Sequence, residues 1–251
     1  MWPFTKHYSL LDSGILNGGT DWHCHILPGV DDGIRTMESA LEVLAAYEQL
    51  GIREVWLTPH IMEDVPNETA ALRTRYAELK AAYAGPIRLR LGAENMIDTL
   101  FDRRFAAGDF LPLGGKEEIP GREGTLLLVE TSYFSPPMSF QDTLDDIRLQ
   151  GLHPLLAHPE RYVYMGRRDY FRLKDNGVLF QLNLMSLTGI YGAEAASKAS
   201  RLLQDGLYDF VGSDLHRLAP WQHAIADNVL NKAEIRALEA LKAQMSREEF
   251  C

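Results

Sequence analysis

Thr20-Asp21-Trp22-His23-Cys24-His25 places two histidines two residues apart at the end of a short run that is typical of a β-strand. Side chains alternate across a strand, so His23 and His25 point the same way while Cys24 points to the other face. Two imidazoles at a strand end can share a metal ion, because histidine is the commonest protein ligand for one. The stretch therefore predicts a metal site whose remaining ligands come from elsewhere in the chain.

Strand-like runs recur along the chain and alternate with helical patterns. Leu126-Leu127-Leu128-Val129 is a continuous apolar run, which is typical of a parallel strand buried on both faces. From Met37 to Ala45 the apolar residues instead follow the spacing of a helix, and Gly51 is placed to end it. The predicted strands are 20–23, 54–58, 87–93, 125–130, 154–157, 179–183 and 209–213, and the predicted helices lie near 37–50, 68–84, 139–150, 162–175, 193–204 and 222–245.

This alternation predicts an α/β fold built on a parallel sheet, either an open doubly wound sheet or a closed barrel. No glycine-rich phosphate fingerprint follows the first strand, which favours a barrel of the TIM type with seven strands. Residues 108–124 contain five glycines and two prolines and are expected to form a loop inside one repeat. We expect a leader at 1–19 and a single domain at 20–251.

Composition excludes several classes of protein. The net charge of −10 argues against a nucleic-acid binder, which needs a basic face. No apolar run approaches the ~20 residues that span a bilayer, and the first residues do not resemble a signal peptide. Two cysteines cannot build a disulfide framework, so a reducing cytoplasm is the expected location. The sequence does not predict an oligomeric state.

Acids and histidines stand at the carboxyl ends of six of the seven predicted strands, or in the loop after the first strand. This is the rim on which barrel enzymes place their chemistry. Taken singly, each could be an ordinary structural residue, but the set exceeds one metal site and suits two or three ions that share a carboxylate. Nitrogen and oxygen ligands suit manganese, iron or zinc better than magnesium or calcium. The predicted ligands are His23, His25, Asp32, His60, Glu94, Glu130, His158, Asp214 and His216.

One arginine is expected to act beside this metal site. Arg161 follows His158 by three residues, and its guanidinium can grip a phosphate through two hydrogen bonds. Arg167, Arg168 and Arg172 are interpreted as a solvated helix face. Tyr133 and Phe134, just past Glu130, either flank a substrate ring or pack in the barrel mouth.

These motifs resemble the polymerase and histidinol phosphatase (PHP) family, over nearly the whole chain from Asp21 to His216. The resemblance is closest to its metal-dependent protein-tyrosine phosphatases encoded with bacterial capsular and exopolysaccharide genes. The matching motifs are Asp21-Trp22-His23-Cys24-His25 with Val30-Asp31-Asp32-Gly33, Thr58-Pro59-His60, Gly92-Ala93-Glu94, Leu128-Val129-Glu130, Ala157-His158-Pro159-Glu160-Arg161-Tyr162 and Gly212-Ser213-Asp214-Leu215-His216.

The resemblance implies a distorted (β/α)7 barrel, the PHP fold, with three divalent metal ions, manganese first and iron or zinc as alternatives. It implies that Arg161 contacts the phosphate, and that a second arginine follows the last motif by several residues; here Arg217 follows His216 directly. By family position, His23, His25, Glu94 and Asp214 hold one ion, Glu94, Glu130 and His158 the second, and Asp32, His60 and His216 the third.

The expected activity is metal-dependent hydrolysis of a phosphotyrosine protein, and the implied partner is a bacterial tyrosine kinase of polysaccharide synthesis. The alternative is a small-molecule phosphatase, such as one that acts on histidinol phosphate, because the same metals would serve it. A metal-dependent amide hydrolase is a weaker rival, since such enzymes commonly bridge their ions with a modified lysine where this chain has Glu130. A degenerate, non-catalytic domain would have lost ligands, and all nine are present.

Overall fold

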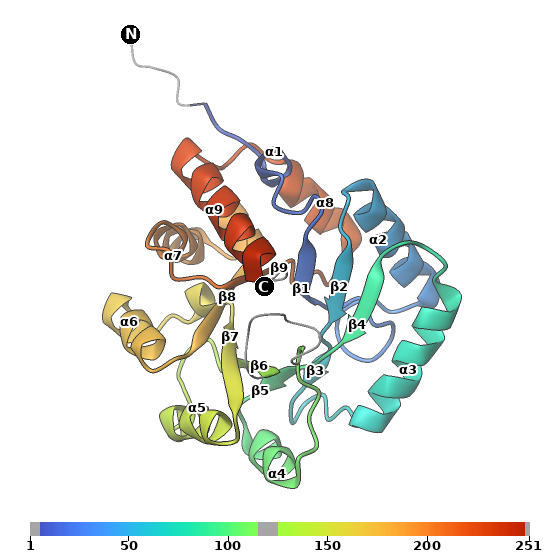
Figure 1. Ribbon diagram of the computed structural model, residues 1–251, viewed down its shortest axis with the longest axis vertical. Coiled ribbons are helices and arrows are strands. Elements are labelled where there is room, and N and C mark those ends of the chain that lie inside the picture. The colour runs from blue at the N-terminus through green and yellow to red at the C-terminus, as the bar shows by residue number, and fades with distance from the viewer. Residues whose placement is uncertain (1–5, 115–124, 249–251) are drawn as a thin grey trace.

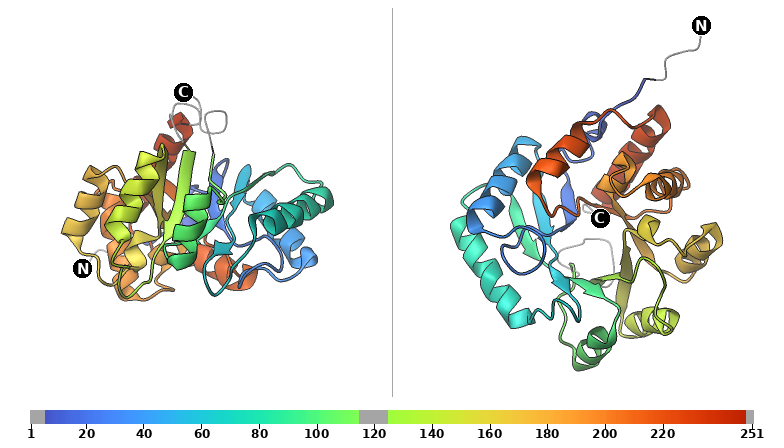
Figure 2. Two further views of the ribbon diagram at one scale, coloured as in Figure 1. Left: turned by 90° about the horizontal axis from the view of Figure 1, so that it is seen from below. Right: turned by 180° about the vertical axis from the view of Figure 1, so that it is seen from behind.

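The computed structural model describes residues 6–114 and 125–248 of the chain. Parallel strands lie at the centre and the helices surround them, as seen in Figure 1 and from two further directions in Figure 2. The strands are β1 Thr20–Cys24, β2 Glu54–Leu57, β3 His60–Ile61, β4 Arg88–Leu91, β5 Glu94–Met96, β6 Thr125–Glu130, β7 Leu152–Ala157, β8 Leu179–Asn183 and β9 Phe210–Gly212.

Helices alternate with these strands along most of the chain. The α-helices are α1 Leu10–Ser13, α2 Met37–Gln49, α3 Thr69–Ala82, α4 Thr99–Ala107, α5 Phe140–Leu149, α6 Arg167–Asp175, α7 Ala193–Gln204, α8 Leu218–Ala226 and α9 Lys232–Glu248, and the 3-10 helices are η1 Pro159–Arg161 and η2 Leu184–Thr188. No helix in the part of the chain that the structure describes is long and apolar enough to cross a membrane.

The strands form two parallel sheets, in the orders β1-β2-β4 and β3-β5-β6-β7-β8-β9. Two short interruptions separate the sheets, because β3 follows β2 after Thr58-Pro59 and β5 follows β4 after Gly92-Ala93. Proline lacks the N–H that a continuous ladder requires. The Glu94 N–H nevertheless donates to the carbonyl of Pro59 at 3.1 Å, so both sheets belong to one curved wall.

Contacts between the first and last strands close this wall. The Asp214 N–H donates to the carbonyl of His23 at 2.8 Å, and the His25 N–H donates to the carbonyl of Leu215 at 3.0 Å. A segment that includes Leu111 and Leu113 lies between the end of β4 and the start of β6. The Ala93 N–H donates to the carbonyl of Leu111, and Leu113 exchanges two backbone hydrogen bonds with Leu126. The structure is therefore the distorted barrel of seven strand positions that the sequence predicts.

Most predicted elements are confirmed, with ends that shift by a few residues. The helix expected over 162–175 begins only at Arg167, because Gly166 is its N-cap and the Gly166 N–H donates to Asp169 at 2.9 Å. The single helix expected over 222–245 is wrong: α8 ends at Ala226 and α9 begins after Asn231. The Asn231 side chain accepts from the N–H groups of Ala233 and Glu234 at 2.8 and 3.1 Å, which starts a new helix.

Two α-helices were absent from the sequence prediction. α4 starts at an Asp98 side chain that accepts from the Phe101 N–H at 2.9 Å, and it ends at Gly108 with a φ of 69°. The predicted leader contains α1, capped by Ser9. Parts of three predictions lie outside the described residues: 1–5 of the leader, 115–124 of the loop and 249–251 of the domain.

The leader packs on the last two helices of the chain. Tyr8 and Leu230 exchange backbone hydrogen bonds of 2.8 and 2.9 Å, and the Lys242 ammonium donates to the carbonyl of Gly14. Leu10 is buried in the same core as Leu238 and Leu241 of α9. The boundary at residue 19 stays a prediction, and the described part of the leader forms one core with the barrel.

Candidate metal centre

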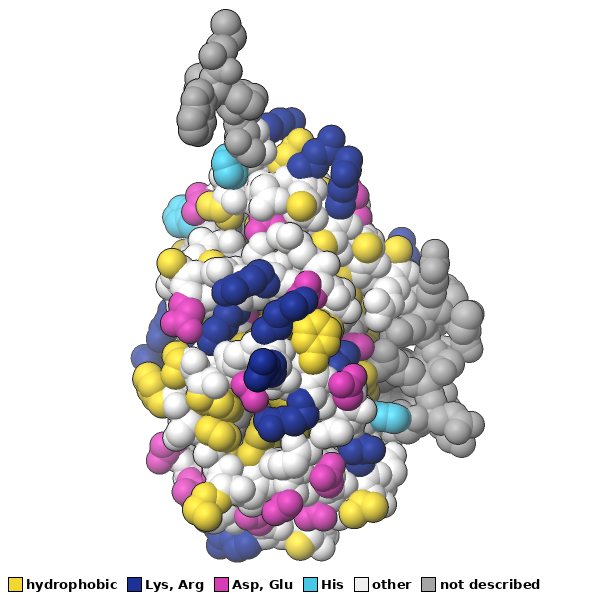
Figure 3. Space-filling view, turned by 90° about the vertical axis from the view of Figure 1, so that its left-hand side faces the viewer, with side chains coloured by type: hydrophobic (Ala, Val, Ile, Leu, Met, Phe, Trp, Pro, Cys, Tyr) yellow, Lys and Arg dark blue, Asp and Glu magenta, His cyan; other side chains and the backbone are white. Residues whose placement is uncertain are grey.

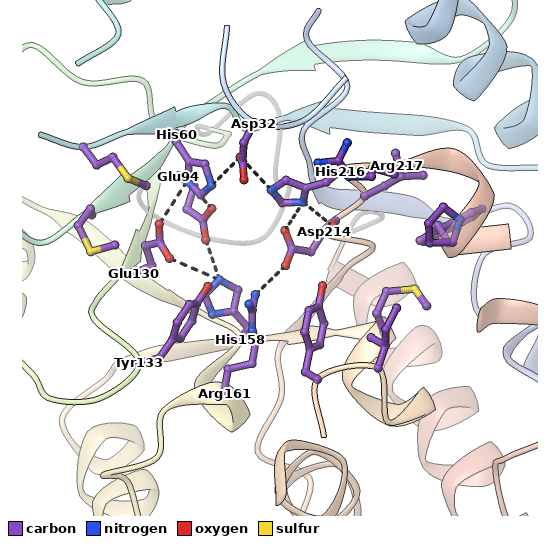
Figure 4. A pocket seen from close by; sticks show the side chains of 18 residues that line it. Asp32, His60, Glu94, Glu130, Tyr133, His158, Arg161, Asp214, His216 and Arg217 are labelled. Atoms are coloured by element: carbon purple, nitrogen blue, oxygen red, sulfur yellow. Dashed lines mark hydrogen bonds and ion pairs between the residues drawn. The ribbon is translucent and has the colours of Figure 1, made fainter. Parts of the chain in front are cut away.

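The predicted ligands converge at the carboxyl ends of the strands. His23 lies in β1, His60 in β3, Glu94 in β5 and Glu130 at the last position of β6. His158, Asp214 and His216 lie just beyond β7 and β9, while His25 and Asp32 come from the segment after β1. Because parallel strands end on the same side of the barrel, residues almost two hundred positions apart share one pocket (Figure 4).

Glu94 lies at the centre of this group. Its Oε2 atom is 3.2 Å from His23 Nε2, 3.4 Å from His25 Nε2 and 3.1 Å from His60 Nδ1. Its Oε1 atom is 2.8 Å from His158 Nε2. One buried carboxylate therefore faces four imidazoles, which is the arrangement expected of a carboxylate shared between ions.

The other acids complete three overlapping groups around Glu94. Asp214 Oδ1 lies 3.6 Å from His23 Nε2 and 3.3 Å from His25 Nε2. Glu130 lies 3.2 Å from His60 Nδ1 and 3.8 Å from His158 Nε2. Asp32 Oδ1 lies 3.6 Å from His60 Nε2 and 3.4 Å from His216 Nε2. His60 therefore borders two groups, whereas the family resemblance places it with Asp32 and His216 alone.

Two of the predicted ligands have an uncommon backbone conformation. His158 has a φ of 35° and Asp214 a φ of 48°, both in the left-handed region that disfavours side chains with a Cβ. Such conformations persist where the surrounding structure imposes them, and they gather at functional sites. Here they turn both side chains into the pocket directly after their strands.

Neighbouring oxygen atoms fix which nitrogen of three of the histidines faces the pocket. His23 Nδ1 is 2.7 Å from the Gln181 side-chain oxygen, and His25 Nδ1 is 2.9 Å from Asp31. His216 Nδ1 is 3.0 Å from the backbone oxygen of Asp214. In each case the Nδ1–H donates to an oxygen, which leaves the Nε2 lone pair directed at the pocket. Partners of this kind orient metal-binding histidines.

Burial and neighbouring charges act in opposite directions on the pKa values of the pocket. Burial opposes a charged imidazole, but hydrogen bonds with Asp214, Asp31 and Glu94 outweigh it and raise the pKa of His25 well above its ordinary value. Burial likewise opposes the ionised form of Glu94, but the charges of His23 and His60 bring its pKa well below the ordinary value. The carboxylates that favour a protonated imidazole here would also favour a bound cation, so a proton and a metal ion would compete for the same nitrogen atoms.

Buried polar atoms test whether this cluster fits metal ions. Among the described residues, His60 Nδ1, Glu94 Oε2 and Glu130 Oε1 are buried without a hydrogen-bond partner, although 3.1 and 3.2 Å separate the nitrogen from the two carboxylate oxygens. Leaving such atoms unsatisfied is costly. A cation between them removes the cost, and the nitrogen and oxygen donors suit a transition metal. The cluster is therefore able to bind metal ions.

The pocket beside the cluster is a cavity of about 570 Å³. Arg161, at the end of η1, lines it and pairs with Asp214 through Nη1 at 3.1 Å. Tyr133 and the exposed Arg217 also line the cavity, whereas Phe134 is 78% exposed and lies outside its lining. Cys24 is buried, and its thiol donates to the carbonyl of Trp56 on the other side of β1.

The arginines of α6 lie on the outer surface, as predicted for a solvated helix face. Figure 3 shows basic side chains gathered on this side of the molecule. Arg167 pairs with Asp205 at 3.3 Å and Arg172 with Asp169 at 3.1 Å, so acids partly neutralise the group. None of the three arginines of α6 lines the cavity of the metal cluster.

Sequence reasoning missed the residues that orient the predicted ligands. Asp31 stood beside Asp32 in the same motif, and nothing in the sequence shows that it faces the buried side of His25. Gln181 and Asn183 lie two residues apart on β8, the one predicted strand without an acid or histidine at its end. Their i, i+2 spacing places both on one face, which was the available signal. Asn183 donates to Asp214 at 2.7 Å.

Fold and cluster together define a metal-binding β/α barrel. The family model for capsular polysaccharide synthesis, CpsB/CapC, matches residues 19–238, and the chain belongs to that family. It is 30% identical to the tyrosine-protein phosphatase YwqE of Bacillus subtilis over 204 residues, which are 79% of this chain and 77% of that protein. It is 27% identical to the putative tyrosine-protein phosphatase CapC of Staphylococcus aureus over 203 residues, again 79% and 77% of the two chains.

A solved structure agrees with these sequence relatives. It is described as YwqE from Bacillus subtilis and CpsB from Streptococcus pneumoniae, unique metal-dependent tyrosine phosphatases. The match has a TM-score of 0.75 and 27% identity, and it covers 91% of each chain. Together these similarities confirm the family resemblance drawn from the motifs.

Proposed function

We propose that this protein is a metal-dependent protein-tyrosine phosphatase. The observation that carries the proposal is the Glu94 carboxylate within 3.4 Å of four imidazoles, at the floor of a cavity that Arg161 also lines. The relatives named as tyrosine-protein phosphatases support this activity over hydrolysis of a small molecule such as histidinol phosphate.

The nine residues named above are the proposed ligands, and the proposed ions are three, with manganese favoured over iron and zinc. His23, His25, Glu94 and Asp214 would hold the first ion; Glu94, Glu130 and His158 the second; Asp32, His60 and His216 the third. Bound ions of this kind supply a water molecule of lowered pKa and neutralise charge on the phosphate. Since a neutral imidazole has one lone pair, His60 can serve only one of the two groups that it borders.

The chain itself positions the substrate. Arg161 pairs with Asp214 through Nη1, and its other N–H groups can donate to two phosphate oxygens. Asp31 and Gln181 hold His25 and His23 so that their Nε2 atoms face the cluster. A tyrosine leaving group has a pKa of ~10, so it departs without a strong general acid. Charge stabilisation by positioned groups is the main chemical contribution of such a site.

The proposed substrate is a phosphorylated tyrosine kinase of polysaccharide synthesis or a related phosphoprotein. The support is the description of the family by its role in capsular polysaccharide synthesis. The proposed location is the cytoplasm, which the free thiol of buried Cys24 fits.

The test is metal-dependent hydrolysis of phosphotyrosine peptides by three purified variants. His60→Ala and Glu130→Ala should lower turnover at saturating manganese by at least a hundredfold, with the circular dichroism spectrum unchanged. His223→Ala removes an exposed histidine of α8 outside the cluster and is the matched control. Near-wild-type turnover by either cluster variant would remove that residue from the site. Faster hydrolysis of histidinol phosphate than of phosphotyrosine peptides would favour the small-molecule alternative.

A further inference from the structure

Arg161 lies between two tyrosine rings. Its Cζ atom is 4.3 Å from the ring centroid of Tyr133 and 4.1 Å from that of Tyr191. Figure 4 shows the Tyr133 ring beside Arg161 in the pocket. Both distances are within the range of cation–π attraction. The Arg161 guanidinium therefore lies over the faces of two aromatic rings, while its Nη1 atom donates to Asp214.

Tyr191 comes from a tight turn that follows η2. Gly189 and Gly192 flank the turn with φ values of 81° and 93°, which favour glycine. The Gly192 N–H donates to the carbonyl of Gly189 at 2.9 Å, and nothing lies within 4 Å of a Cβ built on either glycine. The turn is therefore shaped by backbone conformation, and it brings a tyrosine to the mouth of the cavity.

The same tyrosine is connected to the ligand cluster. The Asn183 side chain is close enough to the Tyr191 hydroxyl to offset part of the effect of burial on the pKa of that tyrosine. Asn183 also donates to Asp214 Oδ2 at 2.7 Å, the oxygen that Arg161 contacts at 3.1 Å. Tyr191, Asn183, Asp214 and Arg161 thus form one connected group.

We propose that Tyr191 is a positioning residue that, with Tyr133, fixes the plane of the Arg161 guanidinium so that its open edge meets the substrate phosphate. This inference rests on the proposed phosphatase function. Without the Tyr191 ring, the flexible arginine side chain is free to rotate and to pair with Asp214 through two N–H groups instead of one. It would then offer fewer donors to phosphate and draw a carboxylate oxygen away from the cluster.

The experiment compares Tyr191→Phe, which keeps the ring, with Tyr191→Leu, which keeps apolar volume but removes the aromatic face. Tyr191→Leu should lower kcat/KM for a phosphotyrosine peptide about tenfold and weaken the binding of inorganic phosphate by a similar factor. Tyr191→Phe should stay within threefold of the wild type in both measurements. Phe171→Leu is the matched control, because Phe171 stacks under Arg167 at 5.0 Å on the outer surface.

A double-mutant comparison separates positioning from a general structural role. In an Arg161→Ala background, Tyr191→Leu should cause no further loss of kcat/KM or of phosphate binding. An equal loss in both backgrounds, or wild-type values for Tyr191→Leu, would overturn the proposal. Elemental analysis of each variant shows whether the metal content has stayed constant. A wild-type protein that binds phosphate but hydrolyses no phosphoester would contradict the proposed function, and calorimetry with inorganic phosphate would still test the role of Tyr191.

Discussion

Replacement of Asp31 by asparagine tests whether a residue outside the ligand set controls metal affinity. The Asp31 side chain has no exposed surface, and its Oδ2 atom is 2.9 Å from His25 Nδ1 and 3.1 Å from the His60 backbone nitrogen. Its Oδ1 atom accepts from the Gly33 N–H at 3.0 Å. Asparagine keeps the shape of the side chain but removes the charge that favours an Nδ1–H on His25.

The magnitude follows from the change in one hydrogen bond. A hydrogen bond to a charged group contributes about 1.5–3 kcal/mol and a neutral one about 0.5–1.5 kcal/mol, so the loss is about 1–1.5 kcal/mol. This corresponds to about a tenfold loss of affinity for manganese, at the lower end of the range for partners of metal-binding histidines. Asp31→Ala also removes the two backbone contacts and should approach a hundredfold loss.

Manganese titration by isothermal calorimetry measures the affinity of each variant directly. Hydrolysis of an aryl phosphate should recover most of the wild-type kcat at saturating manganese, because the ligands themselves remain. Asp12→Asn is the matched control, since the Asp12 carboxylate also accepts a backbone N–H, from Ser9 at 2.9 Å, but lies in α1. Manganese affinity of Asp31→Asn within twofold of the wild type would refute the reasoning.

Three further outcomes are expected. In chelated protein, the pKa of His60 rises to about 10 because Glu94 and Glu130 outweigh burial and the charge of His25. A raised folded-state pKa gives stability that is complete below about pH 6.5 and is lost towards pH 10, so urea unfolding should show a steeper decline over that window for the wild type than for His60→Gln. Asn231→Ala should lower the free energy of unfolding by about 1 kcal/mol with unchanged kcat/KM, because it removes the cap of α9; a change below 0.3 kcal/mol would contradict that role. Leu155→Ala, in the fully buried centre of β7, should cost about 2–5 kcal/mol in urea unfolding, and a cost under 1 kcal/mol would show that the core closes over the gap.

Elements with a strong local pattern were predictable. β6 and β8 match their predicted ranges, and in β6 a continuous apolar run identifies a strand that is buried on both faces. Elements that depend on single capping residues were not. α8 and α9 were merged since their apolar residues suggest one long helix, and only Asn231 with Glu234 reveals the break. The capping residues are visible in the sequence, but the helical spacing of the apolar residues is the stronger pattern and hides the break.

The ligand candidates were predictable for a topological reason. In a parallel barrel, every strand delivers its last residues to the same rim, so a histidine or acid at a strand end can be assigned without knowing any distance. The role of His60 shows where this reasoning stops. Its place at the end of a predicted strand assigns His60 to the rim. Only the structure shows that its Nδ1 atom faces Glu94 and that its Nε2 atom faces Asp32.

The sequence by itself determined the alternation of strands and helices, the family, and the residues at the barrel rim, because each is written in local spacing or in short motifs. The tertiary structure decided which side chains hold the predicted ligands and the arginine in place. Asp31, Gln181 and Tyr191 act through contacts with residues 6, 158 and 30 positions away, and their orientation depends on how the barrel closes. Such contacts arise from packing in three dimensions, for which a single sequence carries no local pattern.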